Sequence, residues 1–329
     1  MKTYKNPVYA SYFADPFVWR HNSEFYAIGT GLSEADGAIH TAASPTVFPL
    51  LRSPDLVHWI PAGHALVRPD DALGDTFWAP EIAFAHGKWW LYYSVGFADR
   101  LHQLRVASSS HPLGPYIDAG ALTDRSTCAF AIDPHPFCDD DGSWYLFHAR
   151  DFLTLQDEHG RDARAGTALV VASLENMTRL SPITHTVARA TCEWQRFAAN
   201  RKMYDAVYDW HTLEGPFVVK EQGRYYCLYS GGCWQTDTYG VDYVVANHVL
   251  GEYSDDGGTT IPRIMRTVAN QVIGPGHCSV VTDADEKRWI AYHAWDAPMT
   301  ARRLCIDPLV FTDEGPRCPG PTWTEQTVR

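Results

Sequence analysis

The chain has 329 residues and a formal net charge of −12, which argues against nucleic acids and anionic membranes as partners, because both disfavour a net anionic surface. Apolar residues make up 45% of the sequence, and 12 Trp, 17 Tyr and 14 Phe make it unusually aromatic, as expected of stacked sheets and of a protein that binds flat ligand faces. There is no run of about 18 apolar residues, so the sequence predicts no membrane-spanning helix.

The N-terminal segment and the cysteines both indicate a reducing compartment. Residues 1–7 lack the apolar core of a secretion signal, so we expect a cytoplasmic protein. The 8 cysteines are scattered, without CxxC spacing or the density of a disulfide scaffold. Buried reduced thiols are therefore favoured over metal ligation or nucleophilic catalysis.

One pattern occurs five times along the chain. A short strand starts at a polar, ionisable residue, passes through a polar turn and returns as an aromatic strand of period two. The paired segments are 15–19 with 25–29, 80–84 with 89–94, 133–137 with 144–148, 209–219 with 225–232, and 276–281 with 289–293. The ionisable residues are Asp15, Glu81, Asp133, Glu214 and His277.

Repeats of short strands at intervals of roughly 50 to 80 residues are typical of a propeller, in which each blade is a small sheet and the blades stack around an axis. Five copies predict an all-β, five-bladed β-propeller. The repeats follow one another without a linker, so we expect a single domain over residues 1–329. If equivalent positions coincide in space, the five ionisable residues converge on one axial funnel.

The longest interval between repeats, from residue 151 to 211, contains an aromatic insertion. Its aromatic residues include Trp194, Phe197, Tyr204, Tyr208 and Trp210. Loops of this length in compact domains are usually functional, so we expect it at the rim of the funnel as a wall for substrate. For any single residue there, a clamp that closes two blades is an equal alternative.

Through six short motifs that follow one another along the chain, the sequence resembles glycoside hydrolase family 43, and the resemblance covers nearly its whole length. The motifs are Phe13-Ala14-Asp15-Pro16, Phe77-Trp78-Ala79-Pro80-Glu81, Ala131-Ile132-Asp133-Pro134, Leu213-Glu214-Gly215-Pro216, Gly274-Pro275-Gly276-His277 and Arg302-Arg303-Leu304-Cys305-Ile306-Asp307-Pro308-Leu309. The family is one of five-bladed propellers that include arabinofuranosidases, arabinanases and β-xylosidases. The resemblance implies that Asp15 is the general base, that Asp133 orients and tunes the acid, and that Glu214 is the general acid.

The chemistry of glycoside hydrolysis supports this division independently. One carboxylic acid must protonate the leaving oxygen, and one carboxylate must act on the opposite face of the sugar. Glu214 lies among Leu213, Gly215, Pro216 and Phe217, which should desolvate it and raise its pKa, and an ionised Asp133 nearby would raise it further. For each carboxylate taken alone, a structural role is the simpler interpretation, namely that of a turn or strand-end residue that binds backbone amides.

Four further residues are candidates for binding. Trp78 is expected to stack on a sugar ring, and Glu81 either contacts substrate or braces the funnel, with bracing favoured. By its distance from Pro308, Arg302 matches the family arginine that reaches the terminal sugar, with Arg303 as the alternative. The resemblance implies that His277 lies on the axis and helps to hold a water-coordinated metal, often calcium, or a cluster of water. No carboxylate cluster with the spacing of a calcium loop accompanies it, and a lone His is usually a satisfied core residue.

We expect arabinose- or xylose-containing oligosaccharides as substrates. The missing signal peptide and the end of the chain at residue 329, without an added β-sandwich, favour an exo-acting, inverting α-L-arabinofuranosidase. A β-xylosidase and an endo-arabinanase are the alternatives within the family, and no cofactor is required for such chemistry. A sugar-binding propeller without catalysis is the alternative of another class, although the intact trio of carboxylates argues against it. The state of assembly is left open.

Overall fold

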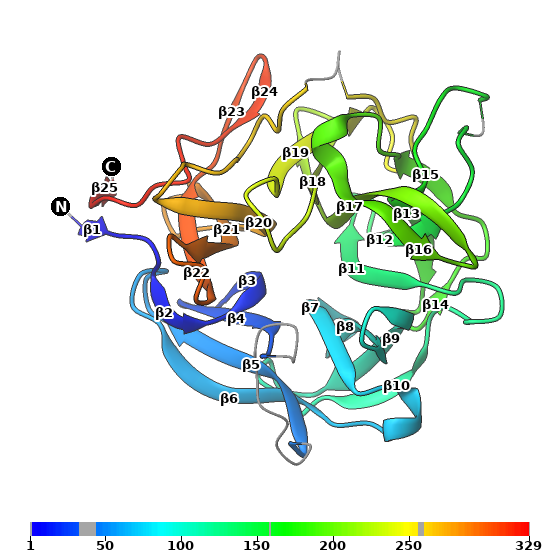
Figure 1. Cartoon of the computed structure of the whole chain (residues 1–329). Helices are drawn as coiled ribbons and strands as arrows, with labels where there is room; N and C mark the ends of the chain where they lie inside the picture. Colours follow the sequence, from blue (N-terminus) through cyan, green and yellow to red (C-terminus); the bar gives the residue numbers. More distant parts are fainter. Residues whose placement is uncertain (1, 33–43, 158, 256–259, 329) are drawn as a thin grey trace.

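The computed structural model describes residues 2–32, 44–157, 159–255 and 260–328. Residues 1 and 329, the two ends of the predicted domain, lie outside the described part. Five blades of β-strands are arranged around a common axis, as Figure 1 shows. The predicted all-β, five-bladed propeller is confirmed. No helix in the described ranges has the length and apolar character needed to cross a membrane.

In blades 1 and 2 the first strand lies nearest the axis. Blade 1 consists of β3 (Ala14–His21), β4 (Glu24–Thr30), β5 (Thr46–Ser53) and β6 (Ile60–Val67). Blade 2 consists of β7 (Thr76–Ala85), β8 (Lys88–Phe97), β9 (Arg100–Ser109) and β10 (Ile117–Ala121), and the short 3₁₀ helix η2 (Asp71–Leu73) precedes it.

Blades 3 and 4 form one continuous sheet. Blade 3 contains β11 (Ala131–Cys138), β12 (Trp144–Phe152), β13 (Gly166–Glu175), β14 (Arg179–Leu180) and β15 (His185–Ala188). Blade 4 contains β16 (Arg196–Met203), β17 (Ala206–Glu221), β18 (Arg224–Gly231) and β19 (Gly240–Ala246), after the 3₁₀ helix η3 (Glu193–Gln195). A short parallel pairing of β13 with β17 joins the two blades.

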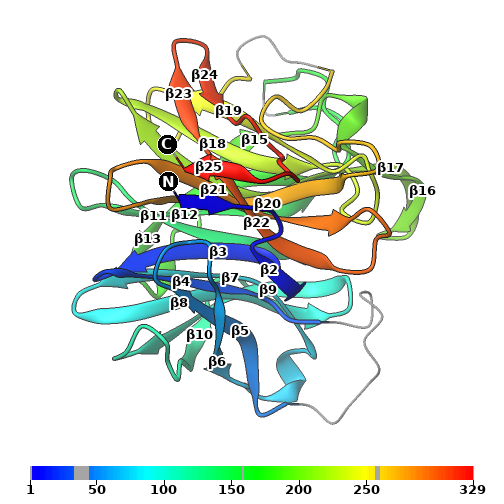
Figure 2. The same ribbon diagram turned by 90° about the vertical axis from the view of Figure 1, so that its left-hand side faces the viewer.

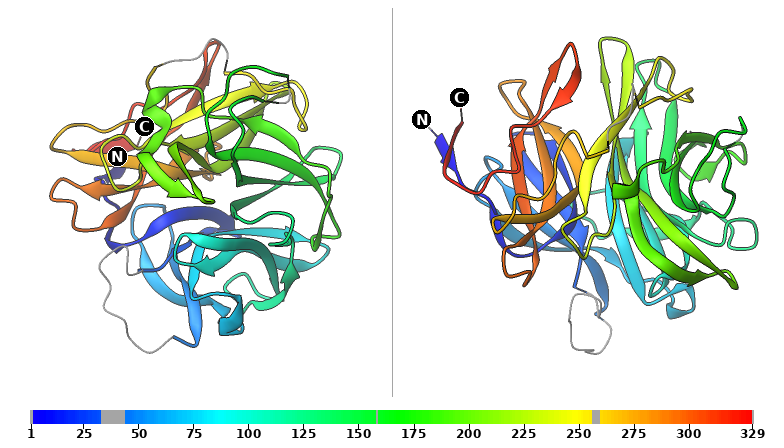
Figure 3. Two further views of the ribbon diagram at one scale, coloured as in Figure 1. Left: turned by 45° about the vertical axis from the view of Figure 1, so that its right-hand side comes forward. Right: turned by 45° about the horizontal axis from the view of Figure 1, so that its top comes forward.

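The two ends of the chain close the ring. Blade 5 is formed by β20 (Val272–Thr282), β21 (Arg288–Asp296) and β22 (Arg302–Pro308), and its outer strand is β2 (Tyr9–Tyr12). Beyond it, β1 (Lys2–Tyr4) pairs with β25 (Gln326–Val328), and β23 (Val310–Thr312) pairs with β24 (Gly315–Arg317). The termini therefore lie side by side, as both views in Figure 3 show.

The polar turns of the repeats fold as the sequence predicts. His86-Gly87 and Gln222-Gly223 each connect the first two strands of a blade through two residues with positive φ, the geometry of a type I′ hairpin turn. The twist of such turns matches the twist of the flanking strands. The hairpins thus fix which residues of each inner strand face the next blade.

Every inner strand contains a bulge close to the axis. The residues at the bulge have φ between 46° and 58°, and they are Asp15, Ala79, Asp133, Gly215 and His277. The ladder register shifts at each of these points. A proline follows the bulge in the first four blades, where it displaces no ladder hydrogen bond. For a residue other than glycine, this backbone conformation costs roughly 1 kcal/mol or more, and it is concentrated at functional sites.

This register corrects the sequence alignment of the repeats. Ala79, and not Glu81, occupies the backbone position equivalent to Asp15, and Glu81 lies two residues further along β7. Glu214 lies one residue before its bulge, which falls at Gly215. The reason is that the proline, and not the charged side chain, marks the equivalent position.

The backbone N–H groups freed by the bulges bind side chains of neighbouring strands. The bonds are Asp15 to His293 Nδ1 (3.1 Å), Ala79 to Thr30 Oγ1 (2.9 Å), Gly215 to Asp133 Oδ2 (2.8 Å) and His277 to Ser230 Oγ (2.7 Å). Because buried backbone donors need partners, these bonds hold four of the bulges in place and join each of these inner strands to the neighbouring blade.

Further along the axis, polar side chains link the inner strands. His135 on β11 accepts the backbone N–H of Val218 at Nε2 (3.0 Å), so its proton is on Nδ1, which donates to Glu81 on β7 (2.7 Å). Ser279 on β20 accepts the backbone N–H of Val18 (3.0 Å). These bonds link blades 2, 3 and 4 to one another and blade 5 to blade 1.

Aromatic side chains fill the spaces between blades. Phe48 of blade 1 packs edge-on against Tyr93 of blade 2, with 5.7 Å between ring centroids, and Phe17 meets Phe217 across the axis at 6.4 Å. All four side chains are at most 9% exposed. Each large apolar side chain buried in this way contributes roughly 1.5–3 kcal/mol, so the interfaces between blades hold the axial strands rigidly.

Candidate active site

The predicted general base, Asp15, lies within a group of basic side chains at the end of the axis. Its Oδ1 is 3.2 Å from His293 Nδ1, 3.4 Å from His277 Nδ1 and 3.4 Å from an Arg302 guanidinium nitrogen. Burial alone raises the pKa of Asp15, but the nearby His277 and Arg302 outweigh it, so the pKa lies well below its ordinary value. Arg302 is charged at every accessible pH, and Asp15 is thus held as a carboxylate.

The predicted general acid, Glu214, is half-buried on β17 and binds one neutral donor. The hydroxyl of Tyr239 donates to Glu214 Oε1 at 2.7 Å. Burial raises the pKa of Glu214 to about 7, the charge of Asp15 raises it as well, and the Tyr239 hydrogen bond and Arg302 oppose them. A carboxyl with this pKa holds a proton in a large share of molecules at neutral pH, as a general acid requires.

Asp133 binds the backbone next to the predicted general acid. Its Oδ2 accepts the backbone N–H of Gly215, the residue after Glu214, and lies 3.9 Å from His277 Nδ1. Burial raises the pKa of Asp133 well above its ordinary value, and the charges of Glu214 and Asp15 raise it further. Asp133 therefore fixes the backbone that carries the acid and is coupled to it electrostatically, which suits an orienting role.

His277 lies on the axis between Asp15 and Asp133. Its ring also lies against Gly215, where a Cβ would be 3.1 Å from the imidazole. Burial lowers the pKa of His277, so the ring is neutral at neutral pH despite the adjacent Asp15. Within residues 2–32, 44–157, 159–255 and 260–328, no group of three or more His, Cys, Asp or Glu is arranged to hold a metal directly. An ion held with the help of His277 would need water to complete its shell.

The axial metal stays a prediction, and chelation tests it. If His277 helps to hold a divalent ion, exhaustive treatment with a chelator lowers activity or the melting temperature, because an ion bound to the folded state stabilises it. Added Ca²⁺ then restores both. Unchanged activity and melting temperature, with no metal detected by elemental analysis, would contradict the prediction.

Arg302, and not Arg303, faces the site. Arg302 also donates to the Tyr12 hydroxyl at 2.7 Å, and its guanidinium carbon lies 4.2 Å from the centroid of the Trp234 ring. Arg303 points the other way and pairs with Asp296 at 2.9 Å. Side chains alternate along a strand, so only one of the two arginines of β22 reaches the axis.

The remaining two predicted binding residues have protein partners. Trp78, one residue before the bulge of blade 2, stacks on His102 with 3.8 Å between centroids. A platform for sugar at Trp78 stays a prediction. Glu81 is 8% exposed, and its carboxylate is bound by His135, which matches the bracing role that the sequence favours.

The aromatic insertion divides into a buried clamp and a rim. Trp210 is 1% exposed, and the Trp194 ring packs where a Cβ at Gly231 would otherwise lie. The hairpin of β16 and β17 projects at one end of the axis, at the right-hand edge of Figure 2. Its tip reaches two other blades, since Tyr204 donates to Asp151 (2.7 Å) and Arg201 pairs with Asp99 (2.7 Å). Trp210 and Trp194 thus pack against protein, whereas both the clamp between two blades and the role of the hairpin as a substrate wall stay predictions.

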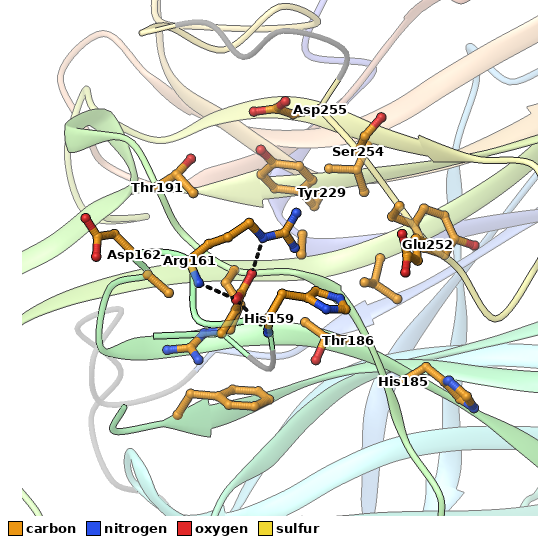
Figure 4. Close-up of a pocket in the computed structure, with 18 of the residues that line it drawn as sticks. His159, Arg161, Asp162, His185, Thr186, Thr191, Tyr229, Glu252, Ser254 and Asp255 are labelled. Atoms are coloured by element: carbon orange, nitrogen blue, oxygen red, sulfur yellow. Dashed lines mark hydrogen bonds and ion pairs between the residues drawn. The ribbon is translucent and has the colours of Figure 1, made fainter. Parts of the chain in front are cut away.

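A cavity of about 1000 Å³ elsewhere contains none of the predicted residues. It lies between the outer parts of blades 3 and 4, where Figure 4 shows His159, His185, Tyr229 and Glu252 among its lining. Two of its charged side chains are paired with each other, since Arg161 binds Asp157 at 2.6 Å. The volume of this cavity is therefore no evidence that it is the catalytic site.

Four residues of the axial group were missed by the sequence analysis. Tyr12 and Trp234 contact Arg302, while Tyr239 and His293 contact Glu214 and Asp15. Of these, only His293 could have been found from the sequence, because it ends a predicted strand of the fifth repeat. Thr30 and Ser230 occupy the equivalent position in two other blades, each opposite the residue before the bulge.

Comparison with known proteins agrees with this geometry. The sequence profile described as "Glycosyl hydrolases family 43" matches residues 4–316. The chain belongs to glycosyl hydrolase family 43. It is therefore a glycoside hydrolase, and the resemblance inferred from the six motifs is confirmed.

Relatives of this family 43 hydrolase differ in the sugars named for them. A β-D-galactofuranosidase of Aspergillus niger is 27% identical and aligns with 94% of this chain and 83% of its own length. An extracellular exo-α-(1→5)-L-arabinofuranosidase of Streptomyces avermitilis is 24% identical, over 88% and 56% of the two chains. An extracellular endo-α-(1→5)-L-arabinanase of Bacillus subtilis is 27% identical, over 86% and 80%. A crystal structure of a thermostable family 43 glycoside hydrolase superposes with a TM-score of 0.79, at 28% identity and 98% coverage of each chain.

Proposed function

We propose that this family 43 hydrolase is an exo-acting, inverting α-L-arabinofuranosidase, which releases terminal arabinofuranosyl units from arabinose-containing oligosaccharides. The observation that carries the proposal is the opposite electrostatic tuning of two carboxyls on one axis. The pKa of Asp15 is held low by basic neighbours, and the pKa of Glu214 is raised to about 7 by burial. This is the pairing of a base with an acid that glycoside hydrolysis needs.

The proposed reaction is a single displacement. Asp15 removes a proton from a water molecule, and the water oxygen forms a bond to the anomeric carbon. The bond from that carbon to the glycosidic oxygen breaks, and the leaving oxygen takes the proton of Glu214. One water is consumed, and exchange with solvent returns Asp15 and Glu214 to their starting states. Arg302 carries two donors toward this end of the axis and is proposed to bind hydroxyls of the terminal sugar.

Inversion is proposed because the base and the acid are held by different side chains. His293 accepts the backbone N–H of Asp15, Tyr239 donates to the carboxyl of Glu214, and these two rings stack with their centroids 5.8 Å apart. Inversion needs a carboxyl separation of roughly 6.5–9.5 Å, which leaves room for water. A retaining enzyme needs about 5 Å.

The choice of a terminal furanoside is supported by the relatives, since two of those compared are named as furanosidases. A β-xylosidase and an endo-arabinanase are the alternatives, and the Bacillus subtilis relative carries the latter name. Initial rates on 4-nitrophenyl α-L-arabinofuranoside, β-D-xyloside and β-D-galactofuranoside, together with product sizes from linear arabinan, test the proposal. We expect the highest kcat/KM on the arabinofuranoside and arabinose as the product of arabinan. A higher kcat/KM on another glycoside, or oligosaccharides as first products, would contradict it.

A further inference from the structure

We propose that Tyr239 is a positioning residue that dictates which oxygen of Glu214 carries the catalytic proton. Tyr239 directly precedes β19, is 1% exposed, and donates its hydroxyl proton to Glu214 Oε1 at 2.7 Å. The proposal deepens the function above, and it rests on the role of Glu214 as the acid.

The ring of Tyr239 is fixed from two sides. It lies parallel to the imidazole of His293, with 4° between the planes, and His293 in turn accepts the backbone N–H of Asp15. On another side is Gly276, where an added Cβ would lie 2.0 Å from Tyr239 Cε1. Only glycine leaves room for the ring at this place. The hydroxyl therefore points at Glu214 from a rigid support shared with the base.

The hydrogen bond has a chemical consequence for the acid. When Glu214 is protonated, its two oxygens differ, since one is a carbonyl acceptor and the other carries the proton. A phenol hydroxyl donates to the carbonyl oxygen, so Oε1 is the acceptor and Oε2 carries the proton. If the proton stays on Oε2, it stays aligned with the glycosidic oxygen. The carboxyl group then loses less conformational freedom on the way to the transition state.

The same bond affects the titration of Glu214. Tyr239 stabilises the carboxylate and so lowers the pKa of Glu214, against burial and the charge of Asp15, which raise it. Burial and the nearby Glu214 raise the pKa of Tyr239 well above 10, so the hydroxyl stays a donor throughout the working range. The titratable or charged groups facing this pair are Asp15, Asp133, Cys233, His293 and Arg302.

The variant Tyr239→Phe removes the hydroxyl and keeps the ring. Because a donor to the carboxylate is lost, the pKa of Glu214 rises, and the alkaline limb of the kcat/KM profile moves up by about one pH unit. We also expect kcat to fall about tenfold more on an oligosaccharide than on an aryl glycoside, whose leaving group needs no proton. Tyr93→Phe is the matched control, since Tyr93 is equally buried and donates to Asp118 at 2.6 Å in blade 2. We expect Tyr93→Phe to leave the alkaline limb and the difference in kcat between the two substrates unchanged.

A second readout keeps the test independent of the substrate. A ¹³C NMR titration of the Glu214 carboxyl carbon reports its pKa in the wild type and in Tyr239→Phe, with Glu214→Gln used to assign the signal. Gly276→Ala, which displaces the Tyr239 ring, gives the same upward shift. Unmoved titration and equal loss of kcat on both substrates would overturn the proposal. Absence of hydrolysis by the wild type would instead contradict the proposed function, while the titration still decides the role of Tyr239.

Discussion

Glu214→Gln reduces kcat on arabino-oligosaccharides by about 10²- to 10⁴-fold, the range expected when a general acid is removed. The amide matches the carboxyl in shape and still accepts from Tyr239, but it has no acidic proton to give. On 4-nitrophenyl or 2,4-dinitrophenyl glycosides the loss is far smaller, because these leaving groups depart as stable anions. Steady-state kinetics on the two kinds of substrate measure the difference.

The control for this variant is Glu221→Gln, on the same strand. Glu221 lies at the far end of β17 and pairs with Arg288 at 2.7 Å, away from the axial group. Its replacement changes kcat little on either kind of substrate. Equal losses on activated and natural substrates in Glu214→Gln would remove Glu214 from the role of the acid.

Asp15→Asn is inactive on activated and natural substrates alike, because the attacking water needs its base whatever the leaving group. We expect a loss of about 10²- to 10⁴-fold in kcat on both. The change also removes a negative charge that raises the pKa of Glu214, so in any residual activity the alkaline limb moves to lower pH.

Two measurements distinguish a lost base from a damaged fold. The melting temperature of Asp15→Asn should stay near that of the wild type, since an amide oxygen still accepts from Arg302. Activity retained on the aryl glycoside alone would contradict the assignment, because that pattern belongs to loss of an acid.

The strands and the ring could be predicted because both follow from local pattern. Alternation of aromatic and β-branched residues with two-residue turns such as Gln222-Gly223 specifies a hairpin without reference to the remainder of the chain. Five such hairpins must bury their faces against one another, and this gives the propeller. The three catalytic candidates were found because each stands near the start of a repeated strand and within one of the six motifs.

The second blade was aligned wrongly because charge was used as the marker. Proline follows Asp15, Ala79, Asp133 and Gly215, and this register identifies Ala79 as the equivalent of Asp15. Proline marks the point where the ladder loses a hydrogen bond, and that point sets the backbone geometry.

The partners of the carboxyls could not be predicted, because they depend on contacts between strands that are not adjacent in the sequence. Tyr239 reaches Glu214 from the far side of blade 4, and His293 reaches Asp15 only because β2 and β22 close the ring. The same closure decides that Arg302 and not Arg303 faces the axis. Sequence spacing fixes the alternation of these side chains but not the face that meets the site.

The stereochemistry of the first-formed sugar tests the central claim most directly, since the claim is that Asp15 acts through water and Glu214 through its proton. Proton NMR during cleavage of an aryl α-L-arabinofuranoside, recorded before mutarotation, distinguishes the two anomers of the released arabinose. We predict β-L-arabinofuranose as the first product, with the α anomer appearing later as the ring equilibrates. An α anomer from the first spectrum onward would mean two displacements and a covalent intermediate, and would contradict the mechanism.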